Sequence, residues 1–172
     1  IDLQLSADQT PMVFHDYGLN RLTVEAGTVA QLNAVQLRAI QLTGGNEGIP
    51  DLDEILALVA GKVPLLIEFK DQDGAMGPNV GPLGQAAAHF LRGYEGAFAV
   101  MSFNPHAVAE LQQLLPDAPR GIVTDPYHAD DWPTLPASVR EGLRDIADYD
   151  PTGSCFISHN QADLSSPRVT AL

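Results

Sequence analysis

The apolar residues of this chain fall into two kinds of short run, which alternate along most of its length. Continuous, β-branched runs such as VPLLIEFKD and AFAVMSF predict strands that are covered on both faces. Runs such as IPDLDEILALVAG and NPHAVAELQQLLP place apolar residues at helical spacing between start and stop residues. Buried strands that alternate with amphipathic helices predict right-handed βαβ units and a parallel sheet.

The first fifty residues depart from this alternation. IDLQLS and TPMVFHD are two extended runs separated by ADQ, and they predict a hairpin. Residues 17–48 are mostly polar, with weak apolar periodicity that predicts one short helix near Gln36. We therefore expect an insertion over about residues 11–50, after the second strand of a single domain.

The remainder of the chain continues the alternation to its last residues. It predicts a helix from about Pro82, a strand in AFAVMSF, a helix with Asn104 as its N-cap, and a strand in RGIVTD. A helix over about 136–147, a strand in SCFIS and the first turn of another helix follow. Five strands of the parallel kind fit either a doubly wound sheet or a (β/α)₈ TIM barrel, for which about 250 residues are typical. Our interpretation is an α/β fold, a barrel that is incomplete in this chain, with residues 1–172 as one partial domain and material missing at both ends.

Composition narrows the function. Of 172 residues, 45% are hydrophobic and 18% charged, which is typical of an ordinary globular domain. The formal net charge is −13 with only 9 Lys and Arg, so a nucleic-acid groove or an anionic membrane surface is disfavoured, and no apolar run is long enough to span a membrane. Cys155 is the only cysteine, and its apolar context predicts a buried, inert thiol. We expect a cytoplasmic protein, and a periplasmic location stays open because the chain begins with Ile1 in what resembles mid-strand sequence.

Candidate chemistry lies where strands of an α/β fold end, because sites form beyond the carboxyl ends of parallel strands. Asp2 lies in the first strand, and His15 ends the second extended run. Glu68 and Lys70 are two residues apart, so they point to the same side of their strand. One interpretation is that Glu68 and Lys70 form an ion pair with a purely structural role. With Asp2 nearby, the two carboxylates could instead bind a hard divalent cation, Ca²⁺ or Mg²⁺, and Lys70 an anion.

These residues occur in segments that resemble the glycerophosphodiester phosphodiesterase family. The segments are DLQLSADQTPMVFHDYGLNRLT, IPDLDEIL, LLIEFK and MSFNP, in that order. The resemblance implies a (β/α)₈ barrel of the kind shared with phosphatidylinositol phospholipase C. It also implies metal-dependent hydrolysis of glycerophosphodiesters to glycerol 3-phosphate and an alcohol.

The same resemblance implies roles for four residues. Asp2 and Glu68 match the family's metal-binding carboxylates, Lys70 matches its phosphate contact, and His15 matches one of two acid/base histidines. The other histidine and a further Glu would lie before Ile1, so we expect this segment alone to be inactive. Two alternatives remain, a non-catalytic barrel that binds a phosphorylated ligand or a cation, and a related phospholipase D-like barrel.

Several other residues carry weaker signals. GAMGPNVG lacks the Lys-Ser/Thr ending of a phosphate-binding loop, so an ordinary loop is predicted. Trp132 could touch a substrate head group, although a packing role is favoured. His159 and Asn160 follow a predicted strand and are expected to be solvated. The expected ligand is thus a small phosphodiester, and the sequence does not define the oligomeric state.

Overall fold

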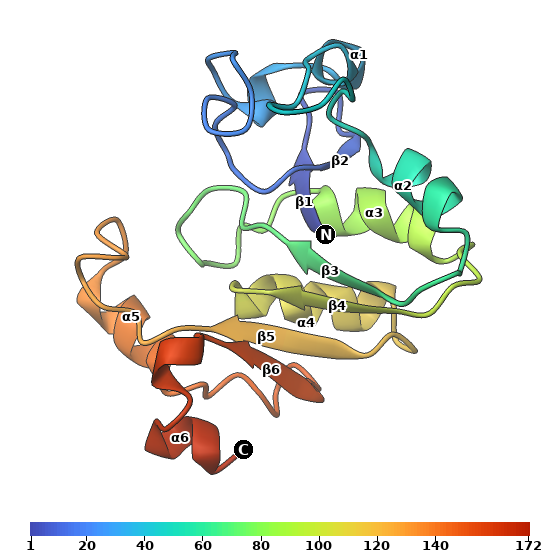
Figure 1. Ribbon diagram of the computed structural model, residues 1–172. Helices are drawn as coiled ribbons and strands as arrows, with labels where there is room; N and C mark the ends of the chain where they lie inside the picture. Colours follow the sequence, from blue (N-terminus) through green and yellow to red (C-terminus); the bar gives the residue numbers. More distant parts are fainter.

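The computed structural model describes residues 1–172 and contains one six-stranded sheet (Figure 1). The strands are β1 (Asp2–Leu5), β2 (Pro11–Val13), β3 (Leu65–Phe69), β4 (Phe98–Ser102), β5 (Arg120–Thr124) and β6 (Phe156–His159). Their spatial order is β2-β1-β3-β4-β5-β6. β1 and β2 form the predicted antiparallel hairpin, and β1, β3, β4, β5 and β6 are parallel. This α/β architecture is consistent with an incomplete barrel.

The α-helices occur between the strands as the apolar spacing predicts. They are α1 (Ala34–Arg38), α2 (Leu52–Val59), α3 (Leu83–Leu91), α4 (Pro105–Leu114), α5 (Ala137–Arg144) and α6 (Pro167–Thr170), with short 3₁₀ helices η1 (Val29–Gln31) and η2 (Gln161–Asp163). Side chains set their starts. Asp51 forms a capping box with Glu54 at α2, and the Asn104 side chain accepts a hydrogen bond from the His106 amide at α4. No helix is both long and apolar enough to cross a bilayer.

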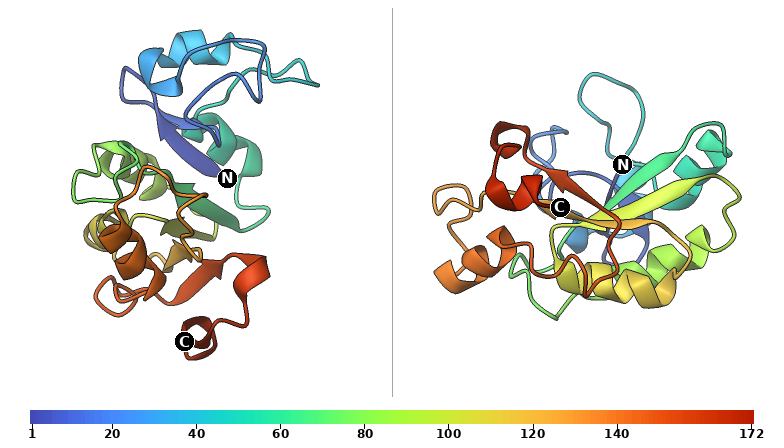
Figure 2. Two further views of the ribbon diagram at one scale, coloured as in Figure 1. Left: turned by 90° about the vertical axis from the view of Figure 1, so that its left-hand side faces the viewer. Right: turned by 90° about the horizontal axis from the view of Figure 1, so that it is seen from below.

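The main core lies between the sheet and the helices on one of its faces. Alternate residues of β3, which are Leu65, Ile67 and Phe69, point to this side and pack with apolar residues of α2, α3 and α4. Figure 2 shows α3 and α4 next to each other along this face. Because side chains alternate along a strand, Glu68 is placed on the opposite face.

The prediction that the parallel strands are covered on both faces is confirmed for β5, in which every residue is buried, but it is wrong for β3 and β6. Leu66, on the face away from the helices, is 45% exposed, and all residues of β6 are only partly buried. Cys155 also differs from its prediction, since it is exposed just before β6. The apolar runs predicted the strands correctly, but an apolar run does not show whether one or both faces of its strand are covered by other elements.

Residues 14–49 form a small second core together with Met12 of β2. Its buried members are Met12, Phe14, Leu19, Val29, Ala34, Leu37 and Ile49. The short helix predicted near Gln36 is α1, which begins at a capping box formed by Asn33 and Gln36. This packing fixes the segment that follows β2, and the segment carries His15.

Candidate functional site

Asp2 and Glu68 are direct neighbours across the parallel pair β1 and β3. Residues in register on adjacent strands project from the same face, so the two carboxylates lie side by side. The Lys70 ammonium is 3.0 Å from Asp2 Oδ1 and 2.5 Å from Glu68 Oε1. The Lys70 and Glu68 side chains are largely buried. The structure therefore brings together three of the four residues that the sequence singled out.

The donor set suits a hard divalent cation. Two carboxylates supply oxygen ligands, and a small cation such as Mg²⁺ is commonly held by one or two carboxylates together with substrate phosphate and water. Nowhere in the chain do three or more His, Cys, Asp or Glu side chains group so that they could hold a metal by themselves. The position between Asp2 and Glu68 already attracts positive charge, as its occupation by Lys70 shows.

His15 follows β2 and is oriented by its neighbour. Its Nδ1 lies 2.6 Å from Asp16 Oδ1, while the side chain remains 56% exposed. The Arg21 guanidinium donates two hydrogen bonds to Asp16, from Nε at 2.5 Å and from Nη2 at 2.6 Å. The bonds from Arg21, helped by His15, lower the pKa of Asp16 to about 2. An ionised Asp16 thus fixes one ring nitrogen and leaves Nε2 of His15 free of protein partners.

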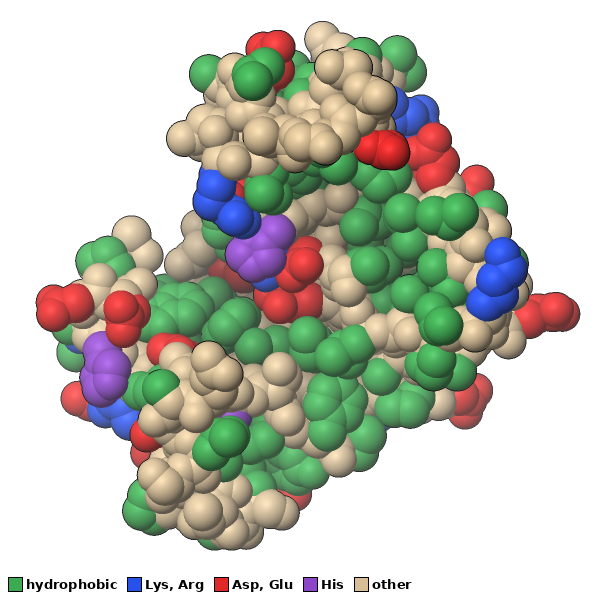
Figure 3. All heavy atoms as spheres, in the orientation of Figure 1, with side chains coloured by type: hydrophobic (Ala, Val, Ile, Leu, Met, Phe, Trp, Pro, Cys, Tyr) green, Lys and Arg blue, Asp and Glu red, His purple; other side chains and the backbone are tan.

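A cavity of about 410 Å³ joins these two groups. His15, Asp16, Glu68 and Lys70 all line it, whereas Asp2 contributes to a neighbouring hollow that His15 also lines. Figure 3 shows a histidine beside acidic and basic side chains in the hollowed centre of this face. The four predicted site residues therefore converge at one end of the sheet.

Asp71, which lines the cavity, belongs to a polar network that the sequence analysis did not predict. Asp71 is 4% exposed and accepts a hydrogen bond from Asn104 Nδ2 at 2.7 Å. Asn104 is fully buried, and its Nδ2 also donates to the Gly77 carbonyl. Ser102 donates to the Phe69 carbonyl and accepts from the Asn104 amide. The network ties the loop after Lys70 to the start of α4. Its sequence signals were that Asp71 and Asn104 each lie two residues after the end of a strand and that Asn104 is a predicted N-cap.

Tyr17 was also not predicted. Its hydroxyl donates to the Asp71 carbonyl at 2.7 Å, and its ring lines the cavity. Desolvation, followed by the charges of Asp71 and Glu68, raises the pKa of Tyr17 to about 12. The phenol therefore stays protonated in any ordinary pH range and serves as a fixed wall of the cavity.

Polar side chains also cluster after β5 and β6. The prediction of a solvated His159 is wrong, because its side chain is only 4% exposed. His159 Nδ1 lies 2.8 Å from Thr124 Oγ1, and its Nε2 lies 3.2 Å from Asp163 Oδ2. Register places Thr124 beside His159, on the face that the main core covers. His159 is thus satisfied by its neighbours, outside the cavity that His15 lines.

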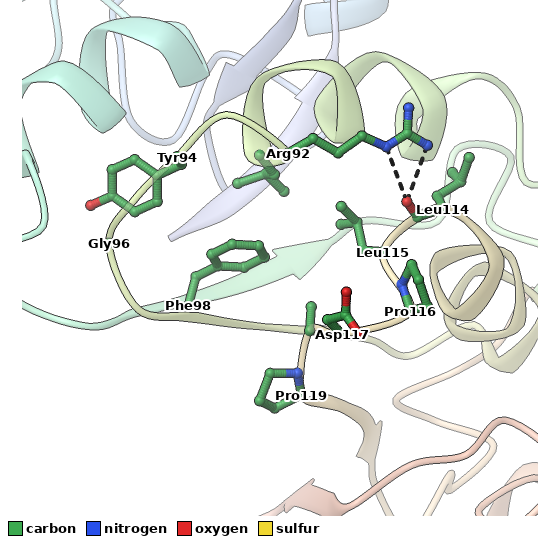
Figure 4. Close-up of a pocket in the computed structure, with 11 residues that line it drawn as sticks. Arg92, Tyr94, Gly96, Phe98, Leu114, Leu115, Pro116, Asp117 and Pro119 are labelled. Carbon is green, nitrogen blue, oxygen red and sulfur yellow. Dashed lines mark hydrogen bonds between the residues drawn. The ribbon is translucent and has the colours of Figure 1, made fainter.

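A larger hollow of about 540 Å³ lies at the other ends of the strands (Figure 4). It is lined by Tyr94 and Phe98, and by Arg92 and Asp117 as its charged residues. Arg92 donates from Nε and Nη2 to the Leu114 carbonyl, at 3.2 and 3.1 Å. Its guanidinium is therefore engaged in joining α3 to the end of α4, and the hollow contains no histidine or paired carboxylates.

Comparisons with known proteins agree with this geometry. Residues 1–153 match the model of the Glycerophosphoryl diester phosphodiesterase family. YhdW of Bacillus subtilis (strain 168), whose name places it among the glycerophosphodiester phosphodiesterases, is 27% identical over 157 residues. The match covers 87% of this chain and 61% of YhdW, so the chain spans less than two thirds of that relative's length.

Solved structures share this fold. One is an Oleispira antarctica phosphodiesterase in complex with its product sn-glycerol-3-phosphate, with a TM-score of 0.71, 20% identity, and coverage of 99% of this chain and 68% of that chain. Another is a glycerophosphodiester phosphodiesterase from Agrobacterium tumefaciens str. C58, with a TM-score of 0.64, 20% identity, and coverage of 99% and 67%. Since the family model matches most of the sequence, this chain belongs to the Glycerophosphoryl diester phosphodiesterase family.

Proposed function

We propose that the protein hydrolyses glycerophosphodiesters to glycerol 3-phosphate and an alcohol. The observation that carries this proposal is the convergence of His15, Glu68 and Lys70 on one cavity, with Asp2 bonded to Lys70. The glycerol 3-phosphate in the Oleispira antarctica complex supports a small phosphorylated ligand. Because each charged group has a distinct chemical use on a phosphodiester, the arrangement suits catalysis better than packing alone.

Lys70 is proposed to contact the phosphate. Its ammonium is a compact positive charge that is already held at the cavity by two carboxylates. Such a fixed charge stabilises the negative charge that gathers on the phosphoryl oxygens as the P–O bond breaks. Lys70 would therefore orient the diester and offset the charge that develops on its phosphoryl oxygens.

Asp2 and Glu68 are proposed to hold a divalent cation, Ca²⁺ or Mg²⁺. When bound, such a cation supplies Lewis-acid stabilisation of phosphoryl oxygens. The two carboxylates contribute opposite charge from adjacent strands of one sheet. They also hold Lys70 in its place by direct ion pairs, so they orient the phosphate contact as well.

His15 is proposed to transfer protons at the ester oxygen. An imidazole can accept or donate a proton near neutral pH. Asp16 holds Nδ1 of His15, so Nε2 is the nitrogen available for the transfer. The exposed side chain has room to approach a diester bound at Lys70.

The test is a hydrolysis assay on the gene product that contains this chain, with glycerophosphocholine as substrate and glycerol 3-phosphate as the measured product. We expect release of glycerol 3-phosphate that stops with a chelator and returns with Mg²⁺ or Ca²⁺. Calorimetric titration with either cation should show binding that Asp2→Asn weakens. Hydrolysis that is insensitive to both chelation and His15→Ala would refute the proposed roles.

Binding without turnover is the second outcome that the geometry allows. The carboxylates and Lys70 can attract a cation and a phosphate whether or not a proton is transferred. If glycerol 3-phosphate binds in calorimetry while no diester is cleaved, the protein is a binding barrel and the proposed hydrolysis is wrong.

A further inference from the structure

Two aromatic side chains form the wall of the cavity that His15, Glu68 and Lys70 also line. They are Phe103, which follows β4, and Trp132, in the loop after β5. Their ring centroids are 5.2 Å apart with an angle of 56° between the planes. The two rings are thus tilted against each other, and they form adjoining surfaces of the cavity instead of a parallel stack.

Trp132 is held in position by a carboxylate. Its indole Nε1 donates to Asp125 Oδ2 at 2.9 Å, and Asp125 also accepts from Asn160 Nδ2 at 2.8 Å and from the Tyr127 amide at 3.1 Å. The fully buried Tyr127 packs behind the indole, with ring centroids 5.1 Å apart. The indole is therefore fixed by hydrogen bonds at its edge and by packing behind it.

This environment makes the aromatic wall attractive to positive charge. Burial alone would raise the pKa of Asp125, but the hydrogen bonds from Asn160, Trp132 and the Tyr127 amide outweigh it and lower that pKa. Asp125 is then ionised at neutral pH. A carboxylate that accepts the indole N–H increases electron density on the ring, and the face of an indole binds cations best among aromatic side chains.

The cavity therefore offers two kinds of charge recognition. Lys70 is suited to the anionic phosphate, whereas Phe103 and Trp132 line the cavity with aromatic side chains, and the indole is bonded to an acid. The net charge of −13 adds a general attraction for cations. A ligand that carries a phosphate and a quaternary ammonium on one short chain complements both sides.

We propose that Phe103 and Trp132 bind the alcohol part of the phosphodiester and favour a quaternary ammonium head group of the choline type. The inference rests on the proposed function for the phosphate part of the ligand. Within it, Phe103 and Trp132 determine head-group preference, and Asp125 is a positioning residue that acts through Trp132.

The experiment compares two ligands that differ only in charge. These are glycerophosphocholine and the glycerophosphodiester of 3,3-dimethylbutan-1-ol, in which a carbon replaces the quaternary nitrogen. Trp132 is the only tryptophan of the chain, so its fluorescence reports on this wall directly. We expect glycerophosphocholine to bind roughly two- to thirty-fold more tightly than the analogue without the quaternary nitrogen and to change the fluorescence.

Variants test whether the preference for the cation depends on Phe103 and Trp132. Phe103→Leu retains the fluorescent reporter, and Trp132→Leu, measured by calorimetry, removes the indole face. Both should reduce the preference for the cation toward unity, and Asp125→Asn should reduce it part of the way. Tyr94→Leu in the hollow at the other ends of the strands is the matched control and should leave the preference intact. Circular dichroism identifies any variant that fails to fold, and Trp132→Phe then replaces Trp132→Leu, with a reduced preference expected.

Equal affinity of the folded protein for the two ligands would overturn the inference. A preference that survives Phe103→Leu and Trp132→Leu would overturn it as well, since the cation would then bind elsewhere. Neither measurement needs turnover. Hydrolysis without a cation preference therefore refutes only this inference, whereas a cation preference without hydrolysis refutes only the proposed function.

Discussion

The two ends of the parallel strands both carry a hollow, but only one of them presents reactive groups. The hollow at the amino ends is the larger, at about 540 Å³ against about 410 Å³. The Arg92 guanidinium in this hollow donates to the Leu114 carbonyl, and these bonds join α3 to α4. At the carboxyl ends, a histidine, a lysine and carboxylates point into the space that the strands leave open. The two hollows therefore differ in whether their charged side chains are free to contact a ligand, and volume alone does not identify a candidate site.

Removal of the His15 imidazole should reduce activity more than any change at the amino-end hollow. We expect His15→Ala to lower kcat by about 10²- to 10⁴-fold, the usual contribution of a general acid or base. The free energy of unfolding should change by less than about 0.5 kcal/mol, because His15 is exposed. Steady-state kinetics and urea unfolding measure the two effects. His128→Ala, at an exposed loop histidine, is the control, and an equal loss of activity in it would contradict the role of His15.

Removal of the lysine should affect both activity and stability. Lys70→Met takes the positive charge from between Asp2 and Glu68, and we expect kcat/KM to fall by about 10²- to 10³-fold. Breaking a largely buried ion pair costs about 3 kcal/mol of unfolding free energy, measurable in urea. Lys62, the only other lysine of the chain and exposed, provides the control Lys62→Met. If Lys70→Met kept full activity, Lys70 would be structural only.

Loss of the Asp16 partner should have a smaller effect. Arg21→Gln removes both hydrogen bonds to Asp16, so we expect a loss of about ten-fold in kcat from a less well oriented His15. Rescue by Arg21→Lys should be only partial, because an ammonium cannot form the paired bonds. A full activity in Arg21→Gln would show that Asp16 orients His15 unaided.

The same variant has a signature in the pH titration. In the folded protein the pKa of Asp16 is lowered from 3.8 to about 2. A depressed carboxyl pKa stabilises the folded state above about pH 4, and this contribution is lost as the pH falls through about 2. In Arg21→Gln the pKa should return toward 3.8. Carbon-detected NMR of the Asp16 carboxyl measures it, and an unchanged midpoint would assign the shift to another group.

The smallest effect on activity is expected at the amino-end hollow. Arg92→Ala removes two bonds to the Leu114 carbonyl, which should cost about 1 kcal/mol of stability. Hydrolysis and ligand affinity should be unchanged at temperatures well below the unfolding midpoint. A loss of ligand affinity in folded Arg92→Ala would mean that this hollow also affects ligand binding.

The order and type of the elements were predictable because they depend on local patterns. Apolar spacing located α1 to α4, the sequence also indicated α5 and the first turn of α6, and Asn104 and Pro105 marked the start of α4 correctly. The same reasoning could not distinguish a covered strand face from an open one, as Leu66 shows. His159 was misjudged for a related reason, because its burial depends on Thr124, 35 residues away.

Local patterns were enough to place reactive side chains at strand ends, because strand periodicity puts Glu68 and Lys70 on one side, and the order of the motifs indicated the family. Three contacts could be seen only in the folded chain: Asp2 lies in register with Glu68, Arg21 bonds to Asp16, and Asp71 bonds to Asn104. Each of these contacts depends on how separate segments are aligned by packing. Strand register and loop packing are set by the whole core, so a local pattern cannot specify which distant polar atoms come within hydrogen-bonding distance.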